Sequence, residues 1–198
     1  MKRIPIIMLL LIVLGTPSRV CTQGLFRLTN VWRPAGVFAP VYDWQGNLLS
    51  GPQWRVELYG GATSSSLSPV VDYVYGSREI ISFDSPFTGP GFFVSNNGDL
   101  AVLGIPNGGW AWLQVKVWDV TLGTTYEEAV ARGLGGYGES PIFYAQGSPV
   151  ADTPYVPAPL IGLQSFSLRA VVPEPATWAL LALGGLGVWW ATRRSQGG

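Results

Sequence analysis

The sequence predicts an all-β domain, an antiparallel β-sandwich of jelly-roll-like or related topology that carries one short helix. Three observations favour this class. Short apolar runs follow one another with a turn signal about every ten residues, two longer segments alternate between apolar and polar side chains, and the chain holds 26 glycine and 16 proline residues. The runs are too closely spaced for βαβ units, which leaves a sandwich or a related barrel.

The first half of the body reads as short strands and turns. Residues 24–30 and 37–42 are strand candidates, and the second leads into a turn at 43–47. Segment 53–59 alternates, with Trp54, Val56 and Leu58 on one side, so we expect one buried face. Further short runs cover 70–75, 79–83 and 92–95.

The second half contains the clearest strand. Asn-Asn-Gly-Asp at 96–99 is a strong turn signal, and 100–103 leads away from it. In segment 110–120 the side chains alternate, so that Leu113, Val115 and Val117 share one face, and the other face carries Trp112, Gln114, Lys116 and Trp118. Runs at 141–146 and 160–169 complete the series. We expect loops at 64–69 and at the proline-rich 151–159.

One helix is predicted at 124–133. A threonine precedes a glutamate by three residues in two registers, Thr124 with Glu127 and Thr125 with Glu128, and Gly133 follows. These are the patterns of a capping box and of a glycine C-terminus. The segment is long enough for about two turns, which we expect to pack across an edge or an end of the sheet.

The amino-acid composition lacks the side chains that common catalytic sites require. The chain has no histidine and a single cysteine, Cys21, which excludes Ser-His-Asp and Cys-His arrangements, the usual zinc sites and any intramolecular disulfide. Glu127 and Glu128 suit the first turn of a helix, and the aspartates lie in or near turns, where they serve the backbone. No D-x-D-x-D spacing indicates calcium. We therefore expect no enzyme, no metal and no cofactor.

Charge sets nucleic acid aside as a partner. The body has seven basic and eleven acidic residues, a net charge of −4, with one lysine and no basic stripe.

The aromatic residues allow two interpretations. The chain holds nine tryptophans, eight tyrosines and eight phenylalanines. Aromatic side chains ordinarily fill a sandwich core, and that interpretation is favoured. However, Trp112 and Trp118 share a strand face with Lys116, which suggests exposure, and an exposed ring can stack on a sugar. They are therefore the candidate glycan contacts.

The N-terminus predicts a secretory signal peptide over 1–22. Lys2 and Arg3 precede an apolar run at 4–14. Two cleavage points fit, before Arg19 and before Leu25. A lipoprotein site at Cys21 is disfavoured because Arg19 and Val20 precede it instead of small residues. A body at 23–170 of normal domain size follows.

The C-terminal segment 171–196 has three parts. Pro173, Glu174 and Pro175 precede an apolar run at 176–192, and Arg193 and Arg194 close it. A helix over this run measures roughly 25 Å, slightly short of a bilayer core. Tryptophans near both ends suit the two interfaces, and the arginines favour a cytoplasmic C-terminus. The run therefore predicts a transmembrane helix, and the two prolines keep the segment before it extended.

In this order the three parts resemble the PEP-CTERM sorting signal of bacterial surface proteins. The resemblance is confined to the tail. It implies that exosortase, a membrane-embedded protease-transpeptidase, recognises and processes Pro173-Glu174-Pro175. It also implies a Gram-negative host, a single-pass inner-membrane precursor with a periplasmic body, release to the cell surface or exterior, and an association with exopolysaccharide.

Three functions follow as hypotheses. The first is an exported, non-enzymatic surface or extracellular-matrix protein, as in a biofilm, with exosortase and the membrane as partners. The alternative is a carbohydrate-binding module that holds exopolysaccharide through exposed aromatics. A secreted hydrolase using carboxylates is the least favoured, since it needs two of them across a cleft.

Overall fold

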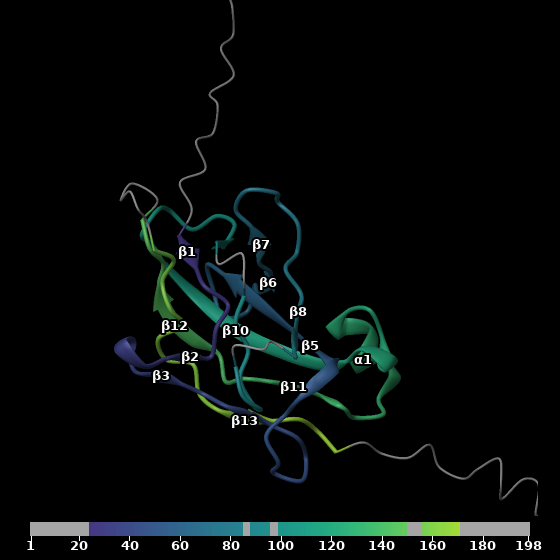
Figure 1. The fold of residues 1–198 in the computed structure, drawn as a ribbon. Helices are drawn as coiled ribbons and strands as arrows, with labels where there is room; N and C mark the ends of the chain where they lie inside the picture. Colours follow the sequence, from purple (N-terminus) through teal and green to yellow (C-terminus); the bar gives the residue numbers. More distant parts are fainter. Residues whose placement is uncertain (1–23, 85–87, 96–98, 150–155, 171–198) are drawn as a thin grey trace, which may run out of the picture.

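One six-stranded antiparallel sheet organises the structure (Figure 1). The structure is a computed structural model, and it describes residues 24–84, 88–95, 99–149 and 156–170. Its centre is the pair β5 (Gly51–Gly61) and β10 (Trp110–Asp119). Two strands pair with the other edge of β10, and two with the other edge of β5: β11 (Tyr137–Glu139), β12 (Phe143–Gln146), β6 (Ser68–Pro69) and β8 (Ile81–Phe83).

The β5–β10 pair joins the two segments with the longest apolar–polar alternation. Its register runs without interruption from Trp112 opposite Gly61 to Asp119 opposite Trp54. Since residues that face each other across a strand pair point to the same side, this register aligns the two alternations. The shared apolar face then forms one wall of the core.

The core lies on the inner face of this sheet. Val56, Leu58, Leu113, Val115 and Val117 are fully buried there. They pack with buried side chains of the opposite layer, among them Phe26, Phe93, Leu100 and Leu160. Burial of one such side chain stabilises the fold by about 1.5–3 kcal/mol, so this apolar interface is the main source of stability.

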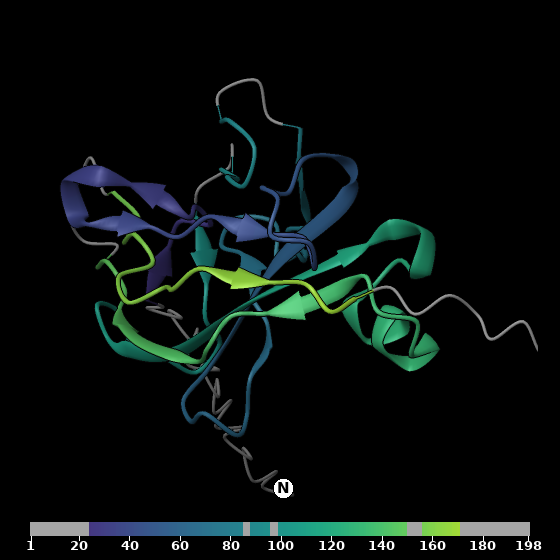
Figure 2. The same cartoon turned by 90° about the horizontal axis from the view of Figure 1, so that it is seen from below.

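Smaller pairings form the opposite layer. One sheet has the order β1 (Leu25–Phe26), β9 (Leu100–Ala101) and β7 (Val71–Asp72), and two further pairs are β13 (Phe166–Ser167) parallel to β4 (Val41–Tyr42) and the hairpin of β2 (Val31–Trp32) and β3 (Val37–Phe38). Figure 2 shows this hairpin and the helix on opposite sides of the large sheet.

A buried amide ties this layer together. Asn30 is fully buried, and its Nδ2 donates to the carbonyls of Ala39 and Gly91, both at 2.8 Å. Its Oδ1 accepts the amide hydrogen of Phe93 at 2.8 Å. A buried polar group is tolerated when it is paired in this way, and here it joins three segments that are distant in sequence.

Helix α1 (Tyr126–Arg132) confirms the predicted helix and its caps. Thr125 is the N-cap, whose Oγ1 accepts the amide hydrogen of Glu128 at 3.3 Å. The Glu128 carboxylate accepts from the Thr124 amide at 2.7 Å. Gly133 follows with a φ of 68°, a conformation that glycine adopts without strain.

The mostly β, antiparallel character with one short helix is therefore confirmed, and a jelly-roll or related sandwich topology remains a prediction. Several boundaries differ. Segment 37–42 forms two strands, β3 and β4, on either side of Ala39 and Pro40, since proline cannot donate to a ladder. The predicted loop 64–69 contains β6, and strands β2 and β11 were not predicted.

Other predicted strands are shorter. Residues 70–75 pair only at β7, because Asp72 Oδ1 accepts the amide hydrogens of Val74 and Tyr75 and turns the chain. Residues 160–169 pair only at β13, and 92–95 contribute a single bridge, Val94 to Thr29. The predicted signal helix and the transmembrane helix at 176–192 lie outside the described residues. No helix in the described part is long and apolar enough to cross a membrane.

A cavity in this core should destabilise the protein. Leu113→Ala removes a fully buried side chain and is expected to lower the free energy of unfolding by about 3 kcal/mol. Urea denaturation of both proteins measures the difference. Leu103→Ala is the matched control, because Leu103 is 57% exposed and its loss should change stability little. Equal losses in the two variants would contradict the assignment of the core.

Candidate functional site

The candidate site lies on the outer face of the large sheet, which is turned away from the core. Along β10 the side chains of Ala111 and Leu113 enter the core, so alternation directs Trp110 and Trp112 outward. On β12, Tyr144 lies directly opposite Trp112 and points to the same side. We call Trp110, Trp112 and Tyr144 the aromatic strip.

The three rings of the aromatic strip form one stack. The centroid of the Tyr144 ring lies 5.1 Å from that of Trp110 with an interplanar angle of 23°, and 4.8 Å from that of Trp112 with an angle of 37°. Trp110 is 50% exposed and Tyr144 49% exposed, while Trp112 is half-buried. The three rings together therefore form a partly exposed aromatic surface.

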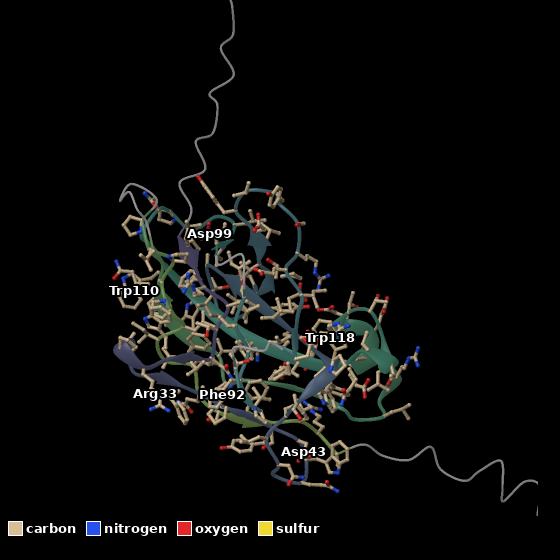
Figure 3. The ribbon with its side chains drawn as sticks, in the orientation of Figure 1. Arg33, Asp43, Phe92, Asp99, Trp110 and Trp118 are labelled. Carbon is tan, nitrogen blue, oxygen red and sulfur yellow. The ribbon has the colours of Figure 1, made fainter. Side chains whose placement is uncertain are left out.

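The predicted exposure of Trp118 is wrong. Trp118 is fully buried, and its indole N–H donates to the carbonyl of Gly123 at 3.1 Å. It belongs to a second small core with Tyr126, Ala129 and Tyr137, which α1 closes. Figure 3 shows Trp118 beside α1 and Trp110 at the far end of β10. A buried ring cannot stack on a surface glycan, so Trp118 is not a glycan contact.

Lys116, between these two ends, is also occupied. Its Nζ lies 3.9 Å from the ring centroid of Tyr59 and 4.7 Å from that of Tyr126. Cation–π contacts of this kind favour a fixed lysine. The lysine whose presence suggested an exposed face therefore helps to hold α1 on the sheet.

A polar chain continues this contact between helix and sheet. The hydroxyl of Tyr59 donates to Glu127 at 2.5 Å and accepts from Arg78 at 3.3 Å. Arg78 in turn forms two hydrogen bonds with the fully buried carboxylate of Glu57, each at 2.5 Å. Removing one partner of such a pair leaves a buried charge uncompensated, so the chain fixes its members in place.

The pKa values of the ionisable groups between α1 and the sheet agree with a structural role. Burial, with the hydrogen bond to Glu127, raises the pKa of Tyr59 well above its usual range. Burial, with the nearby charge of Glu139, does the same to the pKa of Tyr126. For Glu127, burial acts to raise the pKa, but the hydrogen bond from Tyr59, a backbone hydrogen bond and the charges of Lys116 and Arg78 together lower it. None of these groups is tuned toward neutrality, as a general acid or base would be.

Asp43 has the predicted backbone role, and Asp119 has a similar one. Asp43 Oδ1 accepts the amide hydrogens of Gln45 and Asn47 in the turn at 43–47. Asp119 accepts that of Thr121. Among the described residues no group of three metal-ligating side chains could hold an ion.

A shallow hollow of about 320 Å³ lies beside the β2–β3 hairpin. Arg33, Gly36, Val37 and Phe38 line it, and the guanidinium of Arg33 lies 5.4 Å from the ring centroid of Phe38. Among these four lining residues, Arg33 is the one with an ionisable side chain. An arginine stays protonated in proteins and cannot act as a general base, so the described lining offers no acid–base pair for catalysis.

Comparison with known proteins identifies a motif in the C-terminal tail. Residues 171–195 match the family model of the PEP-CTERM protein-sorting motif. The C-terminal tail is a PEP-CTERM sorting motif. No curated protein and no solved structure matches the chain. The motif indicates an exported, membrane-anchored precursor of a Gram-negative bacterium that exosortase sorts.

The residues that carry the PEP-CTERM motif lie outside the described residues. They are the predicted processing residues Pro173, Glu174 and Pro175 and the predicted membrane-stop residues Arg193 and Arg194, whose individual roles remain predictions. The aromatic strip is the feature that sequence reasoning located only in part: it named Trp112, but missed Trp110 and Tyr144. The alternation of 141–146, read against that of 110–120, was the signal that could have paired them.

Glu79 is a buried carboxyl with one oxygen left over. Its Oε1 accepts the hydroxyl hydrogen of Ser95, whereas Oε2 has no hydrogen-bond partner within the described structure. Burial raises the pKa of Glu79, the bond from Ser95 opposes this, and the charges of Asp72 and Asp99 raise it further. The ionised form is therefore unfavourable in the folded state.

The sign of this shift gives a prediction. A carboxyl whose folded pKa lies above its unfolded value lowers stability when it is ionised, and the penalty disappears as pH falls through these values. Glu79→Gln should thus be more stable than the unmodified protein at pH 7, with the advantage lost by about pH 4. Urea denaturation at both pH values measures this.

A control of opposite sign is available in the same protein. The hydrogen bond from Thr124 lowers the pKa of Glu128, so this carboxylate contributes stability above its unfolded pKa that is lost as pH falls. Glu128→Gln should therefore lose stability at pH 7 and less of it in acid. A Glu79→Gln protein that is less stable than the parent at pH 7 would contradict the prediction.

Proposed function

We propose that the chain is a non-enzymatic surface or extracellular-matrix protein of a Gram-negative bacterium, cut by exosortase near Pro173-Glu174-Pro175 and displayed as its β domain. The observation that carries this proposal is the PEP-CTERM motif at 171–195. The proposal adds to it a periplasmic body, an inner-membrane helix at 176–192 and release to the surface or the biofilm matrix.

The use made of the carboxylates supports a non-enzymatic domain. Glu57 is paired with Arg78 and Glu127 with Tyr59. Glu128 caps a helix and Asp43 closes a turn. A hydrolase needs two carboxylates that face a common substrate, whereas each of these groups is committed to a different structural contact.

Exopolysaccharide binding is the second candidate. The aromatic strip favours it, because exposed stacked rings have no role in the core. Binding and display are compatible, since a surface protein needs a means of retention there.

The processing step has a direct test. The mature protein is purified from a host with exosortase and from the same host without it, and both intact masses are measured. With exosortase, the mass should fall by that of the segment after the triplet, and without it the segment from Trp178 to Arg194 should remain.

Two variants sharpen this experiment. Changing Pro173 and Pro175 together to alanine should preserve the full mass in the exosortase host, because the extended recognition site is lost. Pro90→Ala is the matched control, since Pro90 is an exposed proline of the body, and it should be processed normally. An unchanged full mass in both hosts would overturn the proposed processing.

A further inference from the structure

We infer that the aromatic strip of Trp110, Trp112 and Tyr144 binds a neutral polysaccharide by stacking on the sugar rings. This inference rests on the proposed display at the cell surface and deepens it by naming the class of ligand. It replaces Trp118, which is buried, by Trp110 and Tyr144, which are half exposed.

The rings offer the chemistry that a sugar face requires. An aromatic face is negatively polarised, and it attracts the weakly positive C–H groups of a pyranose. Tyr144 stacks on one side of Trp110, and the remaining surface of this half-exposed ring faces solvent. The Tyr144 hydroxyl makes no hydrogen bond within the described structure, so it can serve the hydroxyl groups of a ligand.

A polar rim borders the strip. Gly61 lies opposite Trp112 across the β5–β10 pair, and a Cβ at Gly61 would collide with the backbone of Ser66. The missing side chain therefore lets the loop at 62–67 fold over the outer face beside Trp112. This loop exposes the hydroxyls of Thr63, Ser65 and Ser66, and that of Thr63 hydrogen-bonds to each of the other two.

An amide completes the rim at the other end. Gln146 lies opposite Trp110 in the β10–β12 register, and its Nε2 donates to the carbonyl of Gly108 at 2.9 Å. Rings flanked by hydroxyl and amide groups are the composition of a site that takes a ligand with apolar faces and many hydroxyls. A purely apolar partner would make no use of these polar groups.

Charge selects a neutral polymer over an acidic one. The body carries a net charge of −4, which repels a polyanion at long range. Lys116 is the first cation along the outward side of β10 after the strip, and its ammonium group is held over the rings of Tyr59 and Tyr126. The strip therefore supplies no cation to an acidic sugar.

The exposed area is too small for a stable protein interface. Two half-exposed rings and one half-buried ring present about 250 Å², given the 150–250 Å² of a large aromatic side chain. A stable protein–protein contact needs about 800 Å² on each partner. The area suits a few sugar units, and a second copy of this chain is an outcome that the test must detect.

The strip also lies away from the attachment of the tail. Arg169, next to the last described residue, donates its amide hydrogen to Tyr137, and Tyr137 pairs with Trp118 at the α1 end of β10. Trp110 is eight residues back along the same strand, about 26 Å away, at the opposite end of the sheet (Figures 1 and 3). The strip is therefore remote from the point where the tail joins the domain.

Binding of the full-length exported protein to insoluble polysaccharides tests the inference. The probes are cellulose and agarose, which are neutral, and a calcium alginate gel, which is acidic. The unmodified protein should be depleted from solution by at least one neutral probe and not by alginate. Trp110→Ala and Tyr144→Ala should each weaken that binding about tenfold, as expected for loss of one stacked ring.

Two further variants make the result specific. Trp44→Ala is the matched control, because Trp44 is 42% exposed but lies in the turn at 43–47, and its binding should stay within about twofold of the parent. Trp110→Leu keeps an apolar side chain without a ring face and should lose binding as Trp110→Ala does. Thermal unfolding of every variant verifies the fold.

Several outcomes would overturn the inference. They are binding to neither neutral probe, binding that persists in Trp110→Ala and Tyr144→Ala, equal loss in Trp44→Ala, and a dimer in the parent that Trp110→Ala converts to a monomer. Binding to a polysaccharide does not require cleavage by exosortase. A failure of the binding assay can therefore be told apart from a failure of the mass measurement.

Discussion

The pairing of β5 with β10 organises both layers of the fold. It builds the inner face that holds the core and the outer face that carries both α1 and the aromatic strip. Two adjacent glycines at the end of β5 make this possible. A Cβ at Gly60 would collide with the side chain of Val102, and a Cβ at Gly61 would collide with the backbone of Ser66. At this point Val102 therefore packs closely on one face of β5, and the backbone of Ser66 on the other.

The outer face of the sheet has two parts, one covered by α1 and one exposed to solvent. A seven-residue helix covers about 10 Å, whereas ten-residue β10 extends about 33 Å. Helix α1 therefore seals the end with Trp118, where Tyr59, Glu127 and Lys116 fix it, and leaves the end with Trp110 in solvent. Two tryptophans on the same side of one strand thus become a core residue and a surface residue.

Local patterns predicted those parts of the fold that local rules determine. The alternation of 53–59 and 110–120 identified β5 and β10 and their core-facing side chains, and the threonine–glutamate spacing identified α1. Pairings between distant segments were not predictable in this way. The short β2, β6 and β11 have too few residues to show a period, and the link from Glu127 to Tyr59 spans 68 residues. Exposure of Trp118 was wrongly inferred from Lys116, because alternation assigns a face without showing what packs on it.

Oxidative footprinting of the tryptophans tests whether the outer face has one covered end and one exposed end. Radical labelling with peptide mass spectrometry would follow Trp44, Trp110 and Trp118 with and without a soluble neutral glucan oligosaccharide. We expect Trp44 and Trp110 to be labelled, Trp118 to remain unlabelled, and the oligosaccharide to protect Trp110 but not Trp44. Labelling of Trp118 as strong as that of Trp110, or equal protection of Trp44, would contradict this expectation.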